Sequence, residues 1–364
     1  MNNSIIPSIV NSLLVGIYLL MTIGVDLVSM SRYVTFMEIG LYIMPFMLIV
    51  YGLHFSLLSV IIFAGASLFC LLKGFIYLPL VYLISAPILA QFVVARKFNI
   101  FILYIIWGLI ILVFFNAALK DDLDSFMLCS RNYVSIKLLF VSTLITIIVY
   151  RQSKKIIIWP ALITLILSLM AIGRGGILCS SINFIGLLYL KLLYNSRLGF
   201  KLLFVTLLIS LVVFYWPQIE EIYEASDQLE RLRDEGFEDS SREDIWGEYL
   251  SRLDMTTIIT GVNIYECPLI HSFNNNPHNS YLLLHAYLGI FALIPYCLIL
   301  YALYVNISRK DYVYVLPLIA LLIRCFTDIA LLHYYDFIIL LFVFRSFELK
   351  KDKYAGITSL TSQS

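Results

Sequence analysis

The chain has 364 residues, of which 61% are hydrophobic and only 13% are charged, and its mean hydropathy is +0.91. A soluble protein of this length carries about 25% charged residues. The apolar residues here occur in runs of about twenty, which is long enough to cross a bilayer. The net charge of +1 gives no general attraction for a nucleic-acid backbone. The composition therefore predicts an all-α polytopic integral membrane protein and excludes a general nucleic-acid binder.

Twelve apolar segments are predicted to be membrane-spanning helices. They are 5–25, 33–53, 55–72, 75–95, 98–119, 132–150, 156–172, 175–194, 202–217, 279–304, 312–331 and 334–347. Nine of these helices fall within 1–217 and three within 278–348, with a non-membrane loop at 218–277 between them and a polar cytoplasmic tail at 349–364.

The basic residues between the segments predict the orientation, because cytoplasmic loops are enriched in lysine and arginine. With both termini in the cytoplasm, fourteen basic residues lie on the inner side. The short connections on the opposite side carry five, namely Arg32, Lys73, Lys120, Arg131 and Arg174. The sequence thus places the 218–277 loop outside the cytoplasm.

This long loop has the composition of soluble protein, with fourteen of the 24 acidic residues and four arginines. Its first part favours one or two amphipathic helices broken near Gly236, the second of them capped by Ser240 or Ser241. That second helix is expected to bury an apolar face made of Ile245, Trp246, Tyr249, Leu250 and Leu253. The second part, rich in asparagine and proline, is expected to be a folded loop.

Charged residues inside predicted helices are candidates for function, because each costs roughly 2.5–3.5 kcal/mol at the bilayer centre. Glu38 and Lys137 lie close enough to a helix end for their side chains to reach the interface. Arg174 lies between glycines at a turn, where a guanidinium could bind phosphate and another group could approach the backbone closely, or it could anchor at the headgroups. Arg324 and Asp328, four residues apart, share a helix face and could simply neutralise each other.

Histidine and cysteine patterns argue against a metal site. His278 stands where the loop ends and a helix begins, so it could act as a base or be a hydrogen-bonded structural residue. His271, His278 and His285 recur every seven residues without carboxylates at ligand spacing. The six cysteines are scattered, with a disulfide between Cys129 and Cys267 as an alternative to free thiols.

The sequence also has no Walker A loop, no dinucleotide fingerprint and no nucleophile elbow, and it has no cytoplasmic domain large enough for a nucleotide sugar. The energy for a reaction must then come from the substrate itself. A lipid-linked substrate reached from the membrane meets this requirement.

Four stretches within about 170–340 together resemble the O-antigen polymerase and ligase superfamily. They are Gly173-Arg174-Gly175-Gly176; the long loop with Ser241-Arg242, Trp246 and Thr260-Gly261; Pro277-His278-Asn279 with Leu282 and Gly289; and Leu322-Ile323-Arg324 with Thr327-Asp328 and Asp336. The arginine turn departs from the Ser-Arg-Gly more usual in that family, which leaves the role of its first residue open.

The resemblance implies a metal-independent glycosyltransferase of the polytopic GT-C type in the bacterial inner membrane, active on its periplasmic face. It would transfer a growing glycan from undecaprenyl pyrophosphate to the sugar hydroxyl of another lipid-linked repeat unit, without a cofactor. His278, Arg242 and Arg174 would be catalytic. Substrate binding would fall to Arg324, Asp328, Asn279 and Arg131. Its partners would be the undecaprenyl-pyrophosphate-linked oligosaccharide, the lipid bilayer and a chain-length regulator protein.

Two alternatives remain open at the level of sequence. A ligase would pass the finished glycan to lipid A core, and the stretch around Arg324 favours the polymerase branch over it. A flippase or transporter also needs many helices and intramembrane charge, but it is expected to have two related halves with broken helices at the midplane. Here neither half resembles the other.

Overall fold

The computed structural model describes residues 5–27, 78–119, 132–171, 173–194, 196–197, 206, 242–273, 275–331 and 336–361. The predicted helices at 33–53, 55–72 and 202–217 lie outside this set, apart from residue 206. The same holds for the 218–241 part of the loop, and for Glu38, Cys129 and Arg131.

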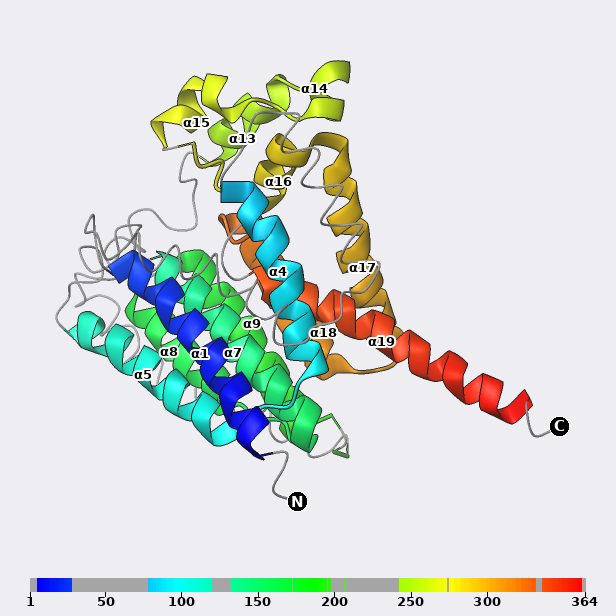
Figure 1. Ribbon diagram of the computed structural model, residues 1–364. Helices are drawn as coiled ribbons and strands as arrows, with labels where there is room; N and C mark the ends of the chain where they lie inside the picture. Colours follow the sequence, from blue (N-terminus) through cyan, green and yellow to red (C-terminus); the bar gives the residue numbers. More distant parts are fainter. Residues whose placement is uncertain are drawn as a thin grey trace.

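Every regular element of the described residues is an α- or 3-10 helix. The long ones are α1 (Ile5–Leu27), α4 (Leu78–Ala95), α5 (Ile100–Leu119), α7 (Asn132–Ser153), α8 (Trp159–Met170), α9 (Arg174–Leu192), α17 (Leu293–Ser308), α18 (Tyr312–Thr327) and α19 (Asp336–Thr361) (Figure 1). Within the part of the chain that the structure describes, four segments are long and apolar enough to cross a membrane, namely Ile5–Ile23, Tyr133–Ser153, Arg174–Leu192 and Ser280–Ser308. The all-α class is confirmed, and the twelve spans stay a prediction.

The outer surface of the helices is apolar where a soluble protein would be polar. On α5, Phe101, Ile105, Leu109 and Leu112 are 71%, 49%, 47% and 63% exposed. Their spacing of three or four residues puts them on one face of the helix. An exposed apolar stripe of this kind fits a lipid environment, so the fold is that of a membrane-embedded protein.

The core of the molecule is formed by α7 and the first half of α19. Every residue from Val134 to Val149 of α7 is buried, because α5, α8, α9 and α18 all pack against this helix. This enclosure overturns one expectation. Lys137 is only 1% exposed, so its side chain does not reach an interface but lies inside the bundle.

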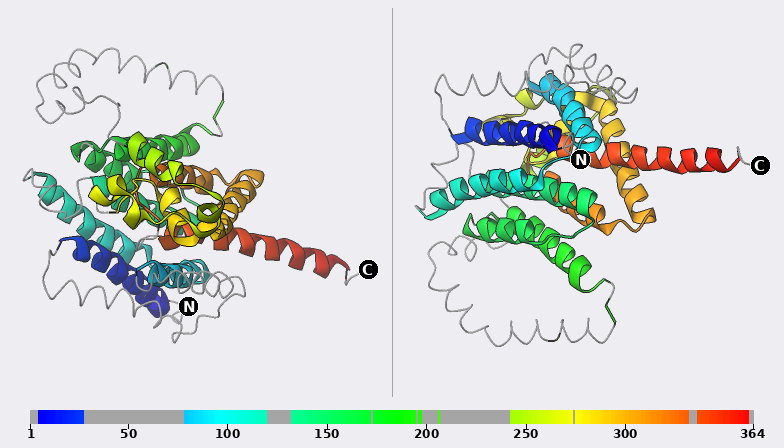
Figure 2. Two further views of the ribbon diagram at one scale, coloured as in Figure 1. Left: turned by 90° about the horizontal axis from the view of Figure 1, so that it is seen from above. Right: turned by 60° about the horizontal axis from the view of Figure 1, so that its bottom comes forward.

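The described part of the long loop lies at one end of the helices (Figure 1) and covers the middle of that end when viewed along it (Figure 2). It consists of α13 (Arg242–Ser251), α14 (Met255–Thr260), a 3-10 turn η2 (Ile264–Glu266) and α15 (Pro268–Ser272). The predicted second loop helix is therefore present, and the predicted folded loop contains short helices.

The apolar face predicted for α13 is only partly right. Ile245 and Tyr249 are buried, whereas Leu250 is 54% exposed. Leu250 follows Ile245 by five residues and is therefore rotated by about 140° from it around the helix.

The single helix predicted at 279–304 is interrupted. α16 (Ser280–Leu288) ends at Gly289, a 3-10 turn η3 (Gly289–Ala292) follows, and α17 begins at Leu293. Gly289 has a φ of +55°, and a Cβ there would lie 2.0 Å from the carbonyl oxygen of Ile259. The break thus lets α14 pack directly on the backbone of the turn.

The last helix is longer than expected. The sequence predicts a helix at 334–347 and a polar tail after it, whereas α19 continues to Thr361 and its second half extends away from the other helices (Figure 1). Its buried first half packs on α4 and α17.

Candidate functional site

Three helix ends meet below the loop, namely the start of α9, the end of α18 and the start of α16. The loop helix α13 packs on them through Trp246. The residues where they meet are called the His278 cluster: His278, Ser280, Arg324, Thr327 and Asp328.

Arg324 and Asp328 form an ion pair inside the protein. Arg324 Nη2 lies 3.2 Å from Asp328 Oδ2, and the two residues are 1% and 2% exposed. Arg324 Nη1 also donates to the hydroxyl of Thr327 at 2.8 Å. The prediction that the pair faces each other is right. The geometry differs from the expected helical one, because α18 ends at Thr327 and Asp328 is in extended conformation.

His278 lies next to this pair and has an unusual backbone conformation. Its φ is +47°, and its backbone N–H donates to Asn276 Oδ1 at 2.7 Å. Its Nδ1 atom lies 3.8 Å from Asp328 Oδ1 and has no hydrogen-bond partner among the described residues. A non-glycine residue at positive φ is strained, and such strain often accompanies a functional position.

The charge state of His278 suits a base. Burial lowers the pKa of His278 below the ordinary histidine value. The negative charge of Asp328 opposes this effect, and the positive charges of Arg242 and Arg324 add to it. A lowered pKa keeps the imidazole neutral near pH 7, so that it can accept a proton.

Asn279 has a structural role. It is the N-cap of α16, and its Oδ1 accepts from the backbone N–H groups of Tyr281 and Leu282 at 2.9 and 3.1 Å. Asparagine commonly caps the N-terminus of a helix in this way. Because Asn279 is only 4% exposed and its Oδ1 belongs to the cap, the geometry does not favour the predicted contact with substrate.

Ser280 ties α16 to the end of α18, a role that the sequence did not suggest. Its hydroxyl donates to the carbonyl oxygen of Asp328 at 2.7 Å and accepts from the N–H groups of Ala330 and Leu331. The only signal in the sequence was its place two residues after His278. Ser280 therefore fixes the distance between His278 and Asp328.

Arg174 is the first residue of α9, directly beside the cluster. A Cβ at Gly175 would lie 3.0 Å from Thr327 Oγ1 and 3.2 Å from Arg324 Nη1, and one at Gly176 would lie 2.0 Å from Ser135 Oγ. The close approach predicted for this glycine turn is confirmed. The start of α9 has no side-chain cap and no acidic residue in its first turn. Its first residue, Arg174, is basic and lies at the positive end of the helix dipole.

Arg242 begins α13 on the other side of the cluster. Its positive charge contributes to the lowered pKa of His278. The helix is held there by Trp246, whose indole N–H donates to the carbonyl oxygen of Pro277 at 3.0 Å and whose ring contacts Phe326 edge-on at 5.1 Å.

The other histidines are not part of the cluster. His285 has both ring nitrogens engaged, one with Tyr249 Oη at 2.7 Å and one with the carbonyl oxygen of Ile258 at 3.1 Å. His271 Nδ1 lies 3.0 Å from Asn275 Oδ1. The described residues contain no group of three or more histidine, cysteine or acidic side chains placed to hold a metal ion. Cys267 is a free, buried thiol, and Cys129, its suggested disulfide partner, lies outside the described residues.

The fold and this site define an all-helical membrane protein with a buried cluster of charge under a folded loop. Comparison with protein families, curated proteins and solved structures finds no match for the chain. Chemically, the site offers arginines for an anion and a neutral imidazole for a proton.

Proposed function

We propose that this protein is a membrane polysaccharide polymerase of the O-antigen type. One observation carries the proposal: His278, Asp328, Arg324 and Arg242, which lie up to 86 positions apart in the chain, are gathered around one site, and Arg174 begins the helix that packs on it. These are the residues to which the family resemblance gives catalytic or binding roles.

The proposed reaction transfers the glycan without a metal. The anomeric carbon of the growing chain loses its bond to the oxygen of undecaprenyl pyrophosphate and forms a bond to a hydroxyl oxygen of the acceptor sugar. Neutral His278 accepts the hydroxyl proton, and undecaprenyl pyrophosphate leaves with the bonding electrons. Asp328, 3.8 Å from His278 Nδ1, stabilises the protonated imidazole.

The pyrophosphate group would be held by arginine and by a helix end. The N-terminus of α9 has backbone N–H groups without a side-chain cap, which favours a phosphate there. Arg174, at this N-terminus, and Arg242, across the cluster, supply fixed positive charge as the leaving group develops its own negative charge. The apolar outer surface fits substrates that arrive through the bilayer.

The substitution Arg174→Lys tests this function in cells that carry the variant as their only copy. Lysine keeps the charge but loses the planar fork that contacts two phosphate oxygens. We expect the polymerisation rate to fall about 10²-fold or more, so that surface polysaccharide shortens to single repeat units at normal protein level. The control is Arg309→Lys, because Arg309 is an exposed arginine after the end of α17, outside the cluster. Normal chain length with both Arg174→Lys and Arg174→Ala would reject the proposed role.

A further inference from the structure

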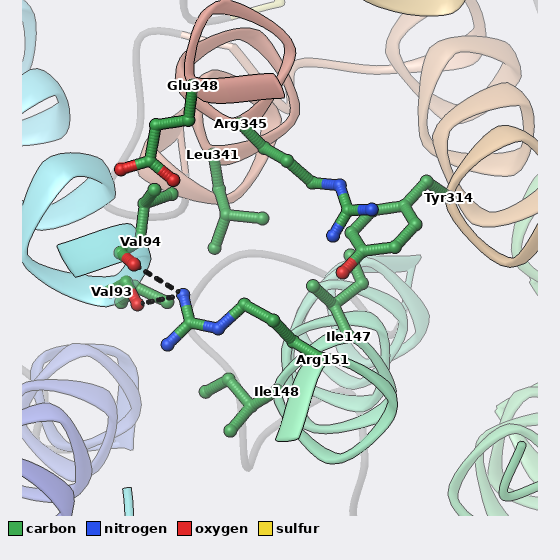
Figure 3. Close-up of a pocket in the computed structure, with 9 residues that line it drawn as sticks. All are labelled: Val93, Val94, Ile147, Ile148, Arg151, Tyr314, Leu341, Arg345 and Glu348. Carbon is green, nitrogen blue, oxygen red and sulfur yellow. Dashed lines mark hydrogen bonds between the residues drawn. The ribbon is translucent and has the colours of Figure 1, made fainter. Parts of the chain in front are cut away.

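A second polar site lies at the other end of α18, away from the His278 cluster. It is a pocket of about 180 Å³ between α4, α7, α18 and α19 (Figure 3). Its polar lining comes from Arg151, Tyr314, Arg345 and Glu348, and the rest of the lining is aliphatic. The mechanism proposed above uses none of these residues.

Two arginines are held rigidly at this pocket. Arg151 donates through Nη1 to the carbonyl oxygens of Val93 and Val94 and through Nη2 to that of Arg96, so it is fixed to the end of α4. Arg345 pairs with Asp311 at 2.5 Å, and its guanidinium carbon lies 3.4 Å from the centre of the Tyr314 ring. A guanidinium fixed in place loses little entropy when it binds an anion.

Polar atoms in the pocket lack partners. Tyr314 is fully buried, and its hydroxyl has no hydrogen-bond partner among the described residues. The same is true of the Nε–H of Arg345. Figure 3 shows the Tyr314 hydroxyl directed into the pocket, below the Arg345 guanidinium. A buried polar group without a partner is unfavourable, so both groups point to a ligand that accepts hydrogen bonds.

The charges around the pocket indicate what that ligand is. Two guanidinium groups and a phenol favour a phosphate, whereas the Glu348 carboxylate on the same lining repels a simple anion and favours a cation near it. With Asp311 paired to Arg345, the acidic and basic charges are equal in number. A group with one negative and one positive charge matches this arrangement.

We propose that the pocket binds the headgroup of a zwitterionic phospholipid, phosphatidylethanolamine. The phosphodiester accepts from Tyr314 Oη, Arg345 Nε and the Arg151 guanidinium, and the ammonium group pairs with Glu348. The aliphatic lining, which includes Val94, Ile148 and Leu341, contacts the glycerol and the start of the acyl chains.

The test measures the thermal unfolding midpoint of the full chain, purified in detergent, as lipid is added. Dioleoylphosphatidylethanolamine should raise the midpoint in a saturable way, because a ligand that binds only the folded state stabilises it. Dioleoylphosphatidylglycerol, which has no ammonium group, should raise it less at the same mole fraction. Soluble phosphorylethanolamine and inorganic phosphate test whether the headgroup or phosphate alone is sufficient, and both should have little effect.

Two variants test the assigned contacts. Tyr314→Phe removes the unpartnered hydroxyl and keeps the ring against Arg345, so the protein should fold while its affinity for phosphatidylethanolamine falls about 2- to 12-fold. Glu348→Gln should abolish the preference over phosphatidylglycerol. Tyr312→Phe is the control, since Tyr312 contacts Tyr194 and does not line the pocket. The proposal is overturned if phosphatidylethanolamine has no saturable effect, if inorganic phosphate acts as strongly, or if Tyr314→Phe and Glu348→Gln both respond like the unaltered protein.

Discussion

At the residue scale, His278 combines strain, a missing hydrogen bond and a lowered pKa. The substitution His278→Gln keeps a hydrogen-bonding side chain but cannot accept a proton at neutral pH. We expect about 10²-fold loss of rate, the lower end of the range for a positioned base, because pyrophosphate is already a good leaving group.

The pH dependence of the rate distinguishes base catalysis from positioning. Because the pKa of His278 is lowered, the imidazole is neutral at pH 7 and becomes protonated only as the pH falls below the ordinary histidine value of about 6.5. If the proposed reaction takes place, the unaltered protein should keep its rate from pH 8 to 7 and lose it in more acidic buffer, whereas His278→Gln should show no such loss. A glutamine variant with near-normal rate would leave His278 a positioning role only.

The structural role of the Arg324–Asp328 pair can be tested separately from the positive charge that Arg324 offers to substrate. Removing one partner leaves a buried charge uncompensated, so Asp328→Asn alone should lower the free energy of unfolding by about 3–5 kcal/mol. The double substitution Arg324→Gln with Asp328→Asn removes both charges and should recover most of that loss. We expect the double variant to fold and yet to remain inactive. Full activity in it would mean that the pair is only structural.

Sequence patterns anticipated part of this chemistry and missed the rest for physical reasons. A spacing of four residues was enough to pair Arg324 with Asp328. The capping role of Asn279 depends on where α16 begins, which a sequence fixes only to within a few residues. The prediction that the Lys137 side chain reaches the interface was wrong, because Lys137 is buried. Its burial results from the helices that pack around α7, and the sequence of α7 alone does not show that packing.

At the scale of elements, the start of α9 depends on two glycines that let it approach its neighbours. A Cβ at Gly176 would overlap the side chain of Ser135, so Gly176→Ala should lower the free energy of unfolding by about 1–3 kcal/mol. Gly108→Ala is the matched control, because nothing lies within 4 Å of a Cβ there, and it should be neutral or stabilising. Equal stability of the two variants, measured by denaturant unfolding in detergent, would contradict this packing.

The elements themselves were predicted with uneven success. The turn that carries Arg174 and the loop helix after Ser241 follow from local glycine and capping signals. The interruption at Gly289 could not be predicted from such local signals, because a glycine within an apolar run is compatible with a continuous helix. The helix is interrupted there because the backbone of α14, from another part of the chain, packs against Gly289. The helical continuation of α19 through a polar segment was also not anticipated.

At the scale of the whole molecule, polar sites lie at the two ends of α18. This helix has 16 residues and is therefore about 24 Å long. Arg151 and Arg345, two of the basic residues assigned to the cytoplasm by composition, line the pocket at one end, and the His278 cluster lies at the other. The two polar sites therefore lie at opposite ends of this helix, and the orientation of the chain in the membrane stays a prediction.

The central claim is that this chain alone joins lipid-linked repeat units. The direct measurement places the purified protein in liposomes with undecaprenyl-pyrophosphate-linked repeats as the only glycan, with EDTA present, and follows the length of the products and the release of undecaprenyl pyrophosphate. We expect a ladder of products, with one undecaprenyl pyrophosphate released for each new linkage. A requirement for lipid A core as acceptor, restoration only by a divalent cation, or movement of the glycan across the bilayer without a new bond would contradict the account.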